Sequence, residues 1–270
     1  MSSAIASASD QAALTPGQRL YLPEYDLLPF REPTRGYLVL APQRTGSNYL
    51  CRRLCNVRGR FGMPSEYLNP VAIRMLAPRL LPGTASDQVP FAAYMAAVQR
   101  ARTSADGWFG IKLQPAQLAV FAPGDRALFD FAASFERVVV LSRRDKLGQA
   151  ISGTLAQLTG TWFNDGTPAS IDRSRWPQLF PAIAANLARY IEEDRRLAAL
   201  GKALARPWLR IEYEEIVSDG QAAFEQLVEF LGVDETVILE EAADVAVPKK
   251  PPVETSEALR ARFLQYIGGG

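Results

Sequence analysis

Short apolar runs alternate with longer amphipathic stretches along this chain. Four runs have the length and the β-branched or aromatic content of buried strands, and they span residues 37–41, 108–113, 137–141 and 208–213. Stretches with helical periodicity follow them, and strands that alternate with helices are typical of a parallel sheet covered on both faces. The pattern therefore predicts an α/β fold with a central, mainly parallel sheet flanked by helices.

The helices expected from this pattern cover residues 47–57, 91–105, 146–158, 176–204 and 224–231, the last ending at Gly232. Residues 71–90 are interrupted by prolines, and we expect them to cover one face. No repeat or linker divides the chain. We therefore expect a single domain over residues 36–270, preceded by a disordered or irregular segment over residues 1–35.

Composition limits the classes of partner. The 270 residues are 48% hydrophobic, which is enough for a core without disulfides or metals, and the net charge of +1 gives no general attraction to nucleic acid or anionic membranes. No apolar run approaches the roughly 20 residues of a membrane span, and the start of the chain lacks the pattern of a signal peptide. We expect a cytoplasmic protein with no nucleic-acid partner and no membrane span.

The chain contains no histidine and two cysteines, Cys51 and Cys55. Four residues apart on one helix face, the two thiols alone make a poor metal site, so we expect no metal and interpret both as buried or half-buried small apolar residues. Histidine is the usual general base near neutral pH. An enzyme with this sequence must deprotonate a nucleophile with a carboxylate, a lysine, a tyrosine or a metal.

The first strand leads directly into a loop suited to an anion, with the sequence Gln43-Arg44-Thr45-Gly46-Ser47-Asn48. Gly46 permits a sharp turn, Ser47 and Asn48 can cap the next helix, and its first N–H groups favour an anion. Arg44 can bind an oxyanion through two parallel hydrogen bonds. The Walker lysine and second glycine are absent, which argues against nucleotide hydrolysis. An ordinary turn with a surface arginine is the alternative.

A second basic loop, Ser142-Arg143-Arg144-Asp145-Lys146, follows the strand at 137–141. Ligands of doubly wound sheets lie at the carboxyl ends of the strands. Arg143 and Ser152, two turns into the next helix, are therefore candidates for a second anion site. Cations are unfavourable at a helix N-terminus, so their clustering favours an anionic ligand. A solvated helix start explains the same residues without one.

Four segments together resemble the bacterial trehalose sulfotransferase family, a branch of the sulfotransferase superfamily. They are the loop at 42–47, Pro64-Ser65-Glu66-Tyr67, Gly110-Ile111-Lys112-Leu113, and Arg143 with Gln149-Ala150-Ile151-Ser152. Order and spacing match over roughly residues 36–215. The resemblance implies a P-loop-like three-layer fold, the donor 3′-phosphoadenosine-5′-phosphosulfate (PAPS), and sulfuryl transfer to a hydroxyl of a carbohydrate or other small-molecule acceptor. It also suggests a homodimer.

Carried over residue by residue, the resemblance implies that Gln43, Arg44, Thr45, Gly46, Ser47 and Asn48 surround the 5′-phosphosulfate of the donor, and that Arg143 and Ser152 bind its 3′-phosphate. Arg44 would also stabilise the charge that develops during transfer. Glu66 takes the place of the catalytic base, and partial burial by its prolines and Tyr67 predicts a raised pKa. Without the resemblance, Glu66 reads as a surface loop glutamate.

Lys112 and Trp162 are candidates for the acceptor side, although Trp162 fits the core equally well. The chain departs from the family pattern in two places: Asn48 replaces a common threonine, and Pro115 stands where an aromatic residue is expected. Segments 70–105 and 155–180 are expected to form the acceptor pocket, and Lys249 and Lys250 to reach the donor. A non-catalytic phosphonucleotide-binding module and a nucleotide or small-molecule kinase remain as alternatives.

Overall fold

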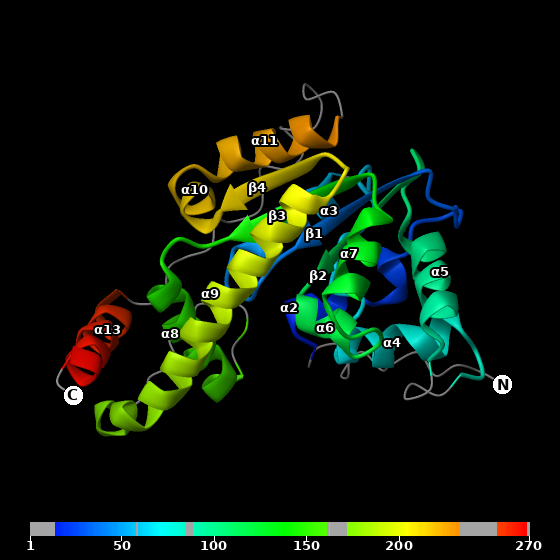
Figure 1. Ribbon diagram of the computed structural model, residues 1–270. Helices are drawn as coiled ribbons and strands as arrows, with labels where there is room; N and C mark the ends of the chain where they lie inside the picture. Colours follow the sequence, from blue (N-terminus) through cyan, green and yellow to red (C-terminus); the bar gives the residue numbers. More distant parts are fainter. Residues whose placement is uncertain are drawn as a thin grey trace.

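Four parallel strands form the centre of the computed structural model, which describes residues 14–57, 59–84, 89–160, 162, 172–232 and 253–268 (Figure 1). They are β1 (Arg35–Leu40), β2 (Trp108–Leu113), β3 (Arg137–Ser142) and β4 (Trp208–Glu212), in the order β2-β1-β3-β4. β2 has the predicted bounds, and the other strands begin and end within two residues of theirs. The predicted fold class, a parallel sheet flanked by helices, is confirmed.

The helices that follow in chain order have the bounds α2 (Pro16–Arg19), α3 (Ser47–Asn56), α4 (Pro70–Leu80), α5 (Phe91–Arg102), α6 (Pro115–Ala119), α7 (Asp125–Ala133), α8 (Lys146–Thr159), α9 (Phe180–Ala203), α10 (Tyr213–Ser218), α11 (Gly220–Leu231) and α13 (Val253–Gly268). Two 3₁₀ turns, η1 (Pro23–Tyr25) and η2 (Arg173–Leu179), precede β1 and α9. The described segment before β1 therefore contains two short helices, α2 and η1.

Three helix starts differ from the sequence prediction for local reasons. The long helix expected from residue 176 begins as the 3₁₀ turn η2, with Pro177 inside it, and becomes α-helical at Phe180. α11 begins at Gly220, four residues early, because the Asp219 carboxylate caps it by accepting from the N–H of Ala222. The proline-interrupted segment forms α4, which starts at Pro70 and continues through Pro78.

One face of the sheet is covered by α3, α10 and α11. Successive strand side chains point to opposite faces, and Tyr37, Val39 and Val139 point to this one. They pack against apolar residues of the three helices, including Leu50, Leu54, Ile216, Phe224 and Leu227. This cluster fixes α3 under the carboxyl end of β1.

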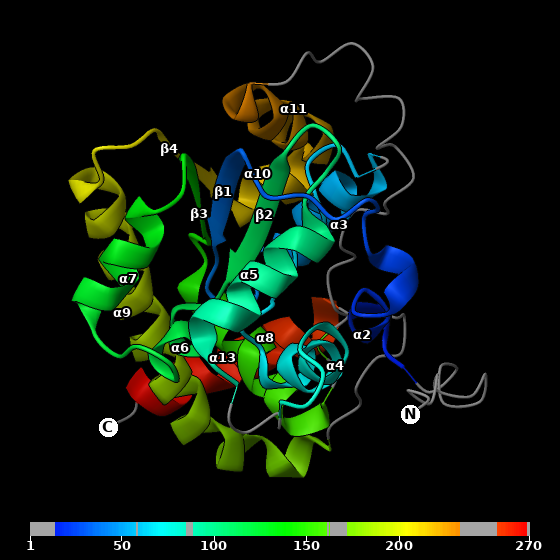
Figure 2. The same ribbon diagram turned by 90° about the vertical axis from the view of Figure 1, so that its right-hand side faces the viewer.

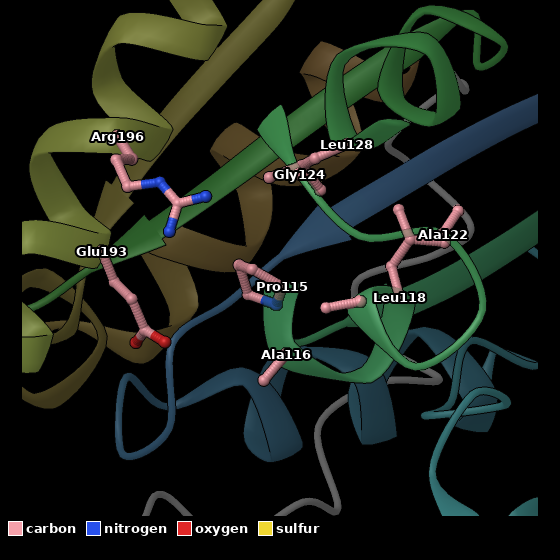
Figure 3. Close-up of a pocket in the computed structure, with 9 residues that line it drawn as sticks. Pro115, Ala116, Leu118, Ala122, Gly124, Leu128, Glu193 and Arg196 are labelled. Carbon is pink, nitrogen blue, oxygen red and sulfur yellow. The ribbon is translucent and has the colours of Figure 1, made fainter. Parts of the chain in front are cut away.

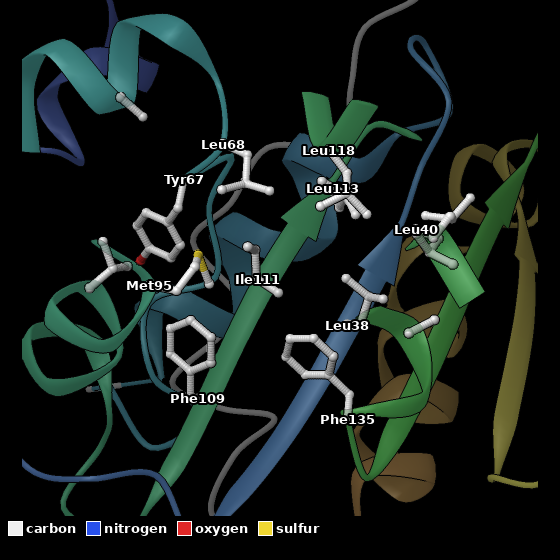
Figure 4. Close-up of a cluster of buried hydrophobic side chains, with 14 of the residues drawn as sticks. Leu38, Leu40, Tyr67, Leu68, Met95, Phe109, Ile111, Leu113, Leu118 and Phe135 are labelled. Carbon is white, nitrogen blue, oxygen red and sulfur yellow. The ribbon is translucent and has the colours of Figure 1, made fainter. Parts of the chain in front are cut away.

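The other face is covered by α4, α5, α6, α7 and α9 (Figure 2). Leu38 and Leu40 of β1 and Ile111 of β2 point into this layer with Tyr67 and Met95 (Figure 4). Helices on both faces make the three layers that were expected. A separate cluster joins α8, η2 and α9 to Leu259 and Phe263 of α13, beside the end of β3.

The strand order places a switch point between β1 and β3. From β1 the chain crosses to β2 on one side, and from β3 it crosses to β4 on the other. Ligands of open α/β sheets bind in the crevice at such a point, outside the carboxyl ends of the strands. The two basic loops leave β1 and β3 at this crevice.

Residues 1–13 of the segment predicted to be disordered or irregular, and the donor contact predicted for Lys249 and Lys250, lie outside the described residues. Within the described part of the chain, no helix combines the length and apolar character required to span a membrane. Cys51 is buried and Cys55 half-buried, as predicted.

Candidate active site

The loop after β1 turns through two left-handed residues, Arg44 with φ 65° and Gly46 with φ 80°. A Cβ on Gly46 would lie 2.9 Å from Cδ1 of Ile216, so both conformation and space require glycine there. The buried Thr45 hydroxyl donates to the carbonyl of Pro42 at 2.8 Å and braces the turn. The loop is therefore held tightly against α10.

Gly46, and neither Ser47 nor Asn48, occupies the N-cap of α3, and no side chain caps this helix. The capping role predicted for Ser47 and Asn48 is therefore wrong. The first N–H groups of a helix have no acceptor inside it. At α3 these groups and the positive end of the helix dipole follow directly after the loop at the carboxyl end of β1, an arrangement that favours phosphate-like anions.

Arg44 reaches from this loop to α8. Its Nε donates to Oγ of Ser152 at 2.9 Å, and a terminal nitrogen donates to the carbonyl of Trp162 at 2.8 Å. Burial lowers the pKa of Arg44, and the nearby charge of Arg143 lowers it further. The structure thus brings Arg44 and Ser152 together. Trp162 contributes its backbone carbonyl, and the residue is 37% exposed and lies outside the core.

Arg143 is the cation of the second loop that faces the crevice. Its guanidinium carbon lies 4.4 Å from the centroid of the Tyr213 ring, and its side chain is only 15% exposed. Its nearest carboxylate, that of Asp145, is 3.8 Å away. Among the described residues no hydrogen-bond acceptor reaches its buried Nε. This nitrogen is a buried donor without a protein partner in the described part of the chain.

The other two cations of that loop have protein partners. Arg144 is 66% exposed and pairs with Glu212 at 2.7 Å, while Lys146 pairs with Asp194 at 3.2 Å. These two cations therefore have an explanation that needs no anionic ligand. Carboxylates of β4 and α9, distant in sequence, account for them.

Glu66 lies between β2 and the start of α4 and accepts four hydrogen bonds. Oε1 accepts from Nζ of Lys112 at 2.7 Å and from Nε2 of Gln114 at 3.1 Å. Oε2 accepts from Nε2 of Gln117 at 2.8 Å and from Nδ2 of Asn69 at 3.0 Å. Four side chains hold the carboxylate in place, so the interpretation of Glu66 as a surface loop glutamate is wrong.

The pKa of Glu66 is shifted opposite to the prediction. Burial by itself raises it, but the charge and hydrogen bond of Lys112, with the hydrogen bonds of Asn69 and Gln117, outweigh burial and lower it to about 2. The raised pKa predicted from the neighbouring prolines is wrong, because sequence neighbours did not reveal the cation that the fold places beside Glu66.

Lys112 joins the anion loop to Glu66. The side chain leaves β2, whose backbone N–H at this residue donates to the carbonyl of Ser65 at 3.0 Å. Its ammonium donates to Oδ1 of Asn48 in the loop and pairs with Glu66. The structure thus brings together three predicted residues from three separate segments.

Gln43 extends the network in the other direction, to Gln114 and Tyr190, which the sequence did not single out, and to Gln149. Its amide donates to Oε1 of Gln114 at 3.0 Å and accepts from the Tyr190 hydroxyl at 3.2 Å, while its carbonyl accepts from Gln149 at 2.7 Å. A signal existed for Gln114 and Gln117, which directly follow β2. Applying the strand-end rule to that strand as well would have found them.

A small pocket of about 130 Å³ lies between α6 and α9, close to this network (Figure 3). Its lining is mostly apolar, with two charged residues on α9: Pro115, Ala116, Leu118, Ala119, Ala122, Gly124, Leu128, Glu193 and Arg196. None of these comes from segments 70–105 or 155–180, where the sequence placed the acceptor pocket. Much of α5 instead packs in the core.

The described residues contain no group of three or more Cys, Asp, Glu or His side chains arranged to hold a metal ion. The chemistry available at the crevice includes that of Arg44, Arg143, Lys112, the Glu66 carboxylate and backbone N–H groups. Such a set suits the binding of a multiply charged anion beside a proton acceptor.

Comparison with known protein families gives a match over most of the chain. A family model described as Stf0 sulphotransferase matches residues 36–257. No curated protein matches the chain.

Among solved structures, the chain is similar to the sulfotransferase domain of the Synechococcus PCC 7002 olefin synthase, with 18% identity, a TM-score of 0.51, and coverage of 86% of this chain and 90% of that domain. It is also similar to the sulfotransferase STF9 from Mycobacterium avium, with 11% identity, a TM-score of 0.49, and coverage of 88% and 77%. At these identities the likeness concerns the fold alone.

Proposed function

Because this chain belongs to the Stf0 sulphotransferase family and is a sulfotransferase, we propose that its donor is PAPS and that it sulfates a hydroxyl of a carbohydrate or other small-molecule acceptor. The observation that carries the proposal is the position of Lys112, which contacts both the anion loop at Asn48 and the carboxylate of Glu66. One side chain, that of Lys112, therefore connects a candidate proton acceptor to the anion loop.

The residues present fit a donor with two separate anionic groups. The uncapped start of α3 offers N–H groups at the end of β1, and the unpartnered Nε of Arg143 lies at the end of β3. Arg44 and Arg143 are close enough for one charge to lower the pKa of the other arginine, a repulsion that an anion between them would relieve.

We assign the 5′-phosphosulfate to the loop and the 3′-phosphate to Arg143 and Ser152. The loop set is Gln43, Arg44, Thr45, Gly46, Ser47 and Asn48. Ser152 already accepts from Arg44, and a hydroxyl that accepts one hydrogen bond still has its O–H to donate. The pair Arg44 and Ser152 would therefore lie between the two anionic groups of the donor.

The chemistry follows from the groups that surround the crevice. When bound, the donor supplies the sulfuryl group, whose sulfur forms a bond to the acceptor oxygen as the S–O bond to the 5′-phosphate breaks. Glu66 takes the hydroxyl proton, which contributes a factor of roughly 10²–10⁴ in rate. Arg44 and the N–H groups of α3 are preformed donors for the negative charge that develops, and Lys112 adds positive charge nearby. We place the acceptor on the side of Lys112 and Trp162.

Nucleotide binding tests this proposal directly. We expect 3′-phosphoadenosine-5′-phosphate (PAP) to stabilise the protein without metal, by about 2.7 kcal/mol at 100 times its dissociation constant, in a thermal-shift titration. Stabilisation by ATP with magnesium and not by the bisphosphate would reject the proposed donor. Transfer of ³⁵S from labelled PAPS to a panel of sugars and other hydroxyl compounds then identifies the acceptor class.

A further inference from the structure

The carboxylate of Glu66 is saturated. An ionised carboxylate has about four lone-pair positions, and Lys112, Gln114, Gln117 and Asn69 take all four. A general base must accept a hydrogen bond from the group that it deprotonates. One of the four donors therefore has to leave before a hydroxyl can approach Glu66.

Three of the four donors are held in place by a second bond to the protein. Oε1 of Gln114 accepts from Gln43 at 3.0 Å, and Oε1 of Gln117 accepts from the N–H of Gln114 at 3.2 Å. Oδ1 of Asn69 caps α4 by accepting from the N–H of Val71 at 2.9 Å. Moving any of these amides would break a second hydrogen bond elsewhere.

Lys112 differs, because its other partner belongs to the anion loop. Its ammonium contacts Oδ1 of Asn48, one residue into α3, as well as Glu66. A lysine ammonium is a compact charge on a flexible stem. A negatively charged group at the start of α3 would attract it away from Glu66 over a short distance.

We propose that Lys112 is a positioning residue that couples donor binding to the base: the sulfuryl group draws its ammonium toward the loop, which frees one lone pair on Oε1 of Glu66 for the acceptor hydroxyl. This inference rests on the proposed function. It predicts that the donor must be bound before Glu66 can engage an acceptor. The same movement removes the cation that lowers the pKa of Glu66.

The other titratable groups that face Glu66 do not provide this coupling. They are Cys51 on α3 and Tyr21 in the segment before β1. Burial raises the pKa of both, with Glu66 adding to the shift, so both stay neutral at neutral and acidic pH. Lys112 is the cation among the groups that shift the pKa of Glu66.

The test is the ionisation of Glu66 with and without ligand. In protein carrying ¹³C-labelled glutamate, the Glu66 carboxyl resonance is assigned by its loss in Glu66→Gln and followed at acidic pH. We expect PAPS to raise the Glu66 midpoint by about 1–3 units, the usual effect of a neighbouring opposite charge. PAP, which lacks the sulfuryl group, should raise it less.

Two variants separate coupling from local effects. Lys112→Met should raise the midpoint without ligand and reduce the further rise with PAPS to the smaller, direct effect of the added negative charge. Gln117→Met also removes a donor from Glu66 but does not touch the loop, so it should keep the PAPS-dependent rise.

An unchanged Glu66 midpoint in wild-type protein that PAPS demonstrably stabilises in a thermal-shift assay would overturn the coupling and leave the proposed function intact. Failure of both nucleotides to stabilise the protein would instead remove the proposed donor, and this inference with it.

Discussion

Arg143 lies over the ring of Tyr213, with its guanidinium carbon 4.4 Å from the ring centroid. Tyr213 is the first residue of α10, directly after β4. A residue at the end of β4 therefore orients the arginine that follows the neighbouring strand, β3. A cation over an aromatic face is favoured. The stack turns Arg143 into the crevice, whereas Arg144 pairs with Glu212 at 66% exposure.

Arg143→Ala should weaken binding of PAP by about 10- to 100-fold, because hydrogen bonds to charged groups contribute about 1.5–3 kcal/mol. Binding of adenosine 5′-phosphate, which lacks the 3′-phosphate, should change little. Isothermal titration calorimetry measures both ligands. Arg144→Ala is the matched control and should bind PAP almost normally. Equal losses for both ligands in Arg143→Ala would remove Arg143 from the 3′-phosphate.

Glu66→Gln should lower turnover by roughly 10²–10⁴-fold while sparing donor binding, because the amide has the shape of the carboxylate but cannot take a proton. Turnover is measured by ³⁵S transfer to the acceptor found in the screen, and binding by thermal shift with PAP. Glu192→Gln, on the exposed side of α9 beside Arg195, is the control. Near-normal turnover of Glu66→Gln would show that another group accepts the proton.

The same carboxylate makes stability depend on pH. The folded-state pKa of Glu66 is lowered from 4.5 to about 2, so its contribution is complete above about pH 4.5 and is lost as the pH falls toward 2. The free energy of unfolding of wild type should exceed that of Glu66→Gln by about 2 kcal/mol more at pH ~6 than at pH ~3. Urea unfolding at the two pH values measures this, and a difference that does not vary with pH would contradict the lowered pKa.

Gly110 is required by packing against Tyr37. A Cβ on Gly110 would lie 2.2 Å from Cζ and 2.3 Å from Oη of Tyr37, whose buried hydroxyl is fixed by donation to the carbonyl of Phe61 at 3.1 Å. Gly110→Ala should therefore cost about 1–3 kcal/mol in the free energy of unfolding. Gly36→Ala, whose Cβ would meet Phe135 at 3.3 Å, should cost less.

A double variant checks the cause of that loss. Tyr37→Leu removes the ring atoms that Gly110→Ala would strike, so Tyr37→Leu/Gly110→Ala should be more stable than the sum of the two single losses predicts. Strictly additive losses would mean that the ring is not what excludes a side chain at residue 110. Urea unfolding of the four proteins of this cycle gives the coupling energy.

Local signals in the sequence were enough for much of the fold. The apolar run at β2 predicted its bounds at both ends, and Gly232 in the left-handed conformation ends α11 as expected. Gly46 between a buried strand and an amphipathic helix predicted the sharp turn that the structure has there. These signals depend on residues close in the chain, because strand content, helix periodicity and turn conformation are set within a few positions.

Only the tertiary structure decided how the site is charged. The pairing of β1 with β2 brings Glu66, Lys112 and Asn48 together. Gln114 and Gln117 reach Glu66 from the segment that follows the carboxyl end of β2. Arg144 and Lys146 form ion pairs with carboxylates of β4 and α9, which the sequence did not reveal. The direction of a pKa shift depends on which charges lie within a few ångströms, and in this fold those charges come from segments far apart in the sequence.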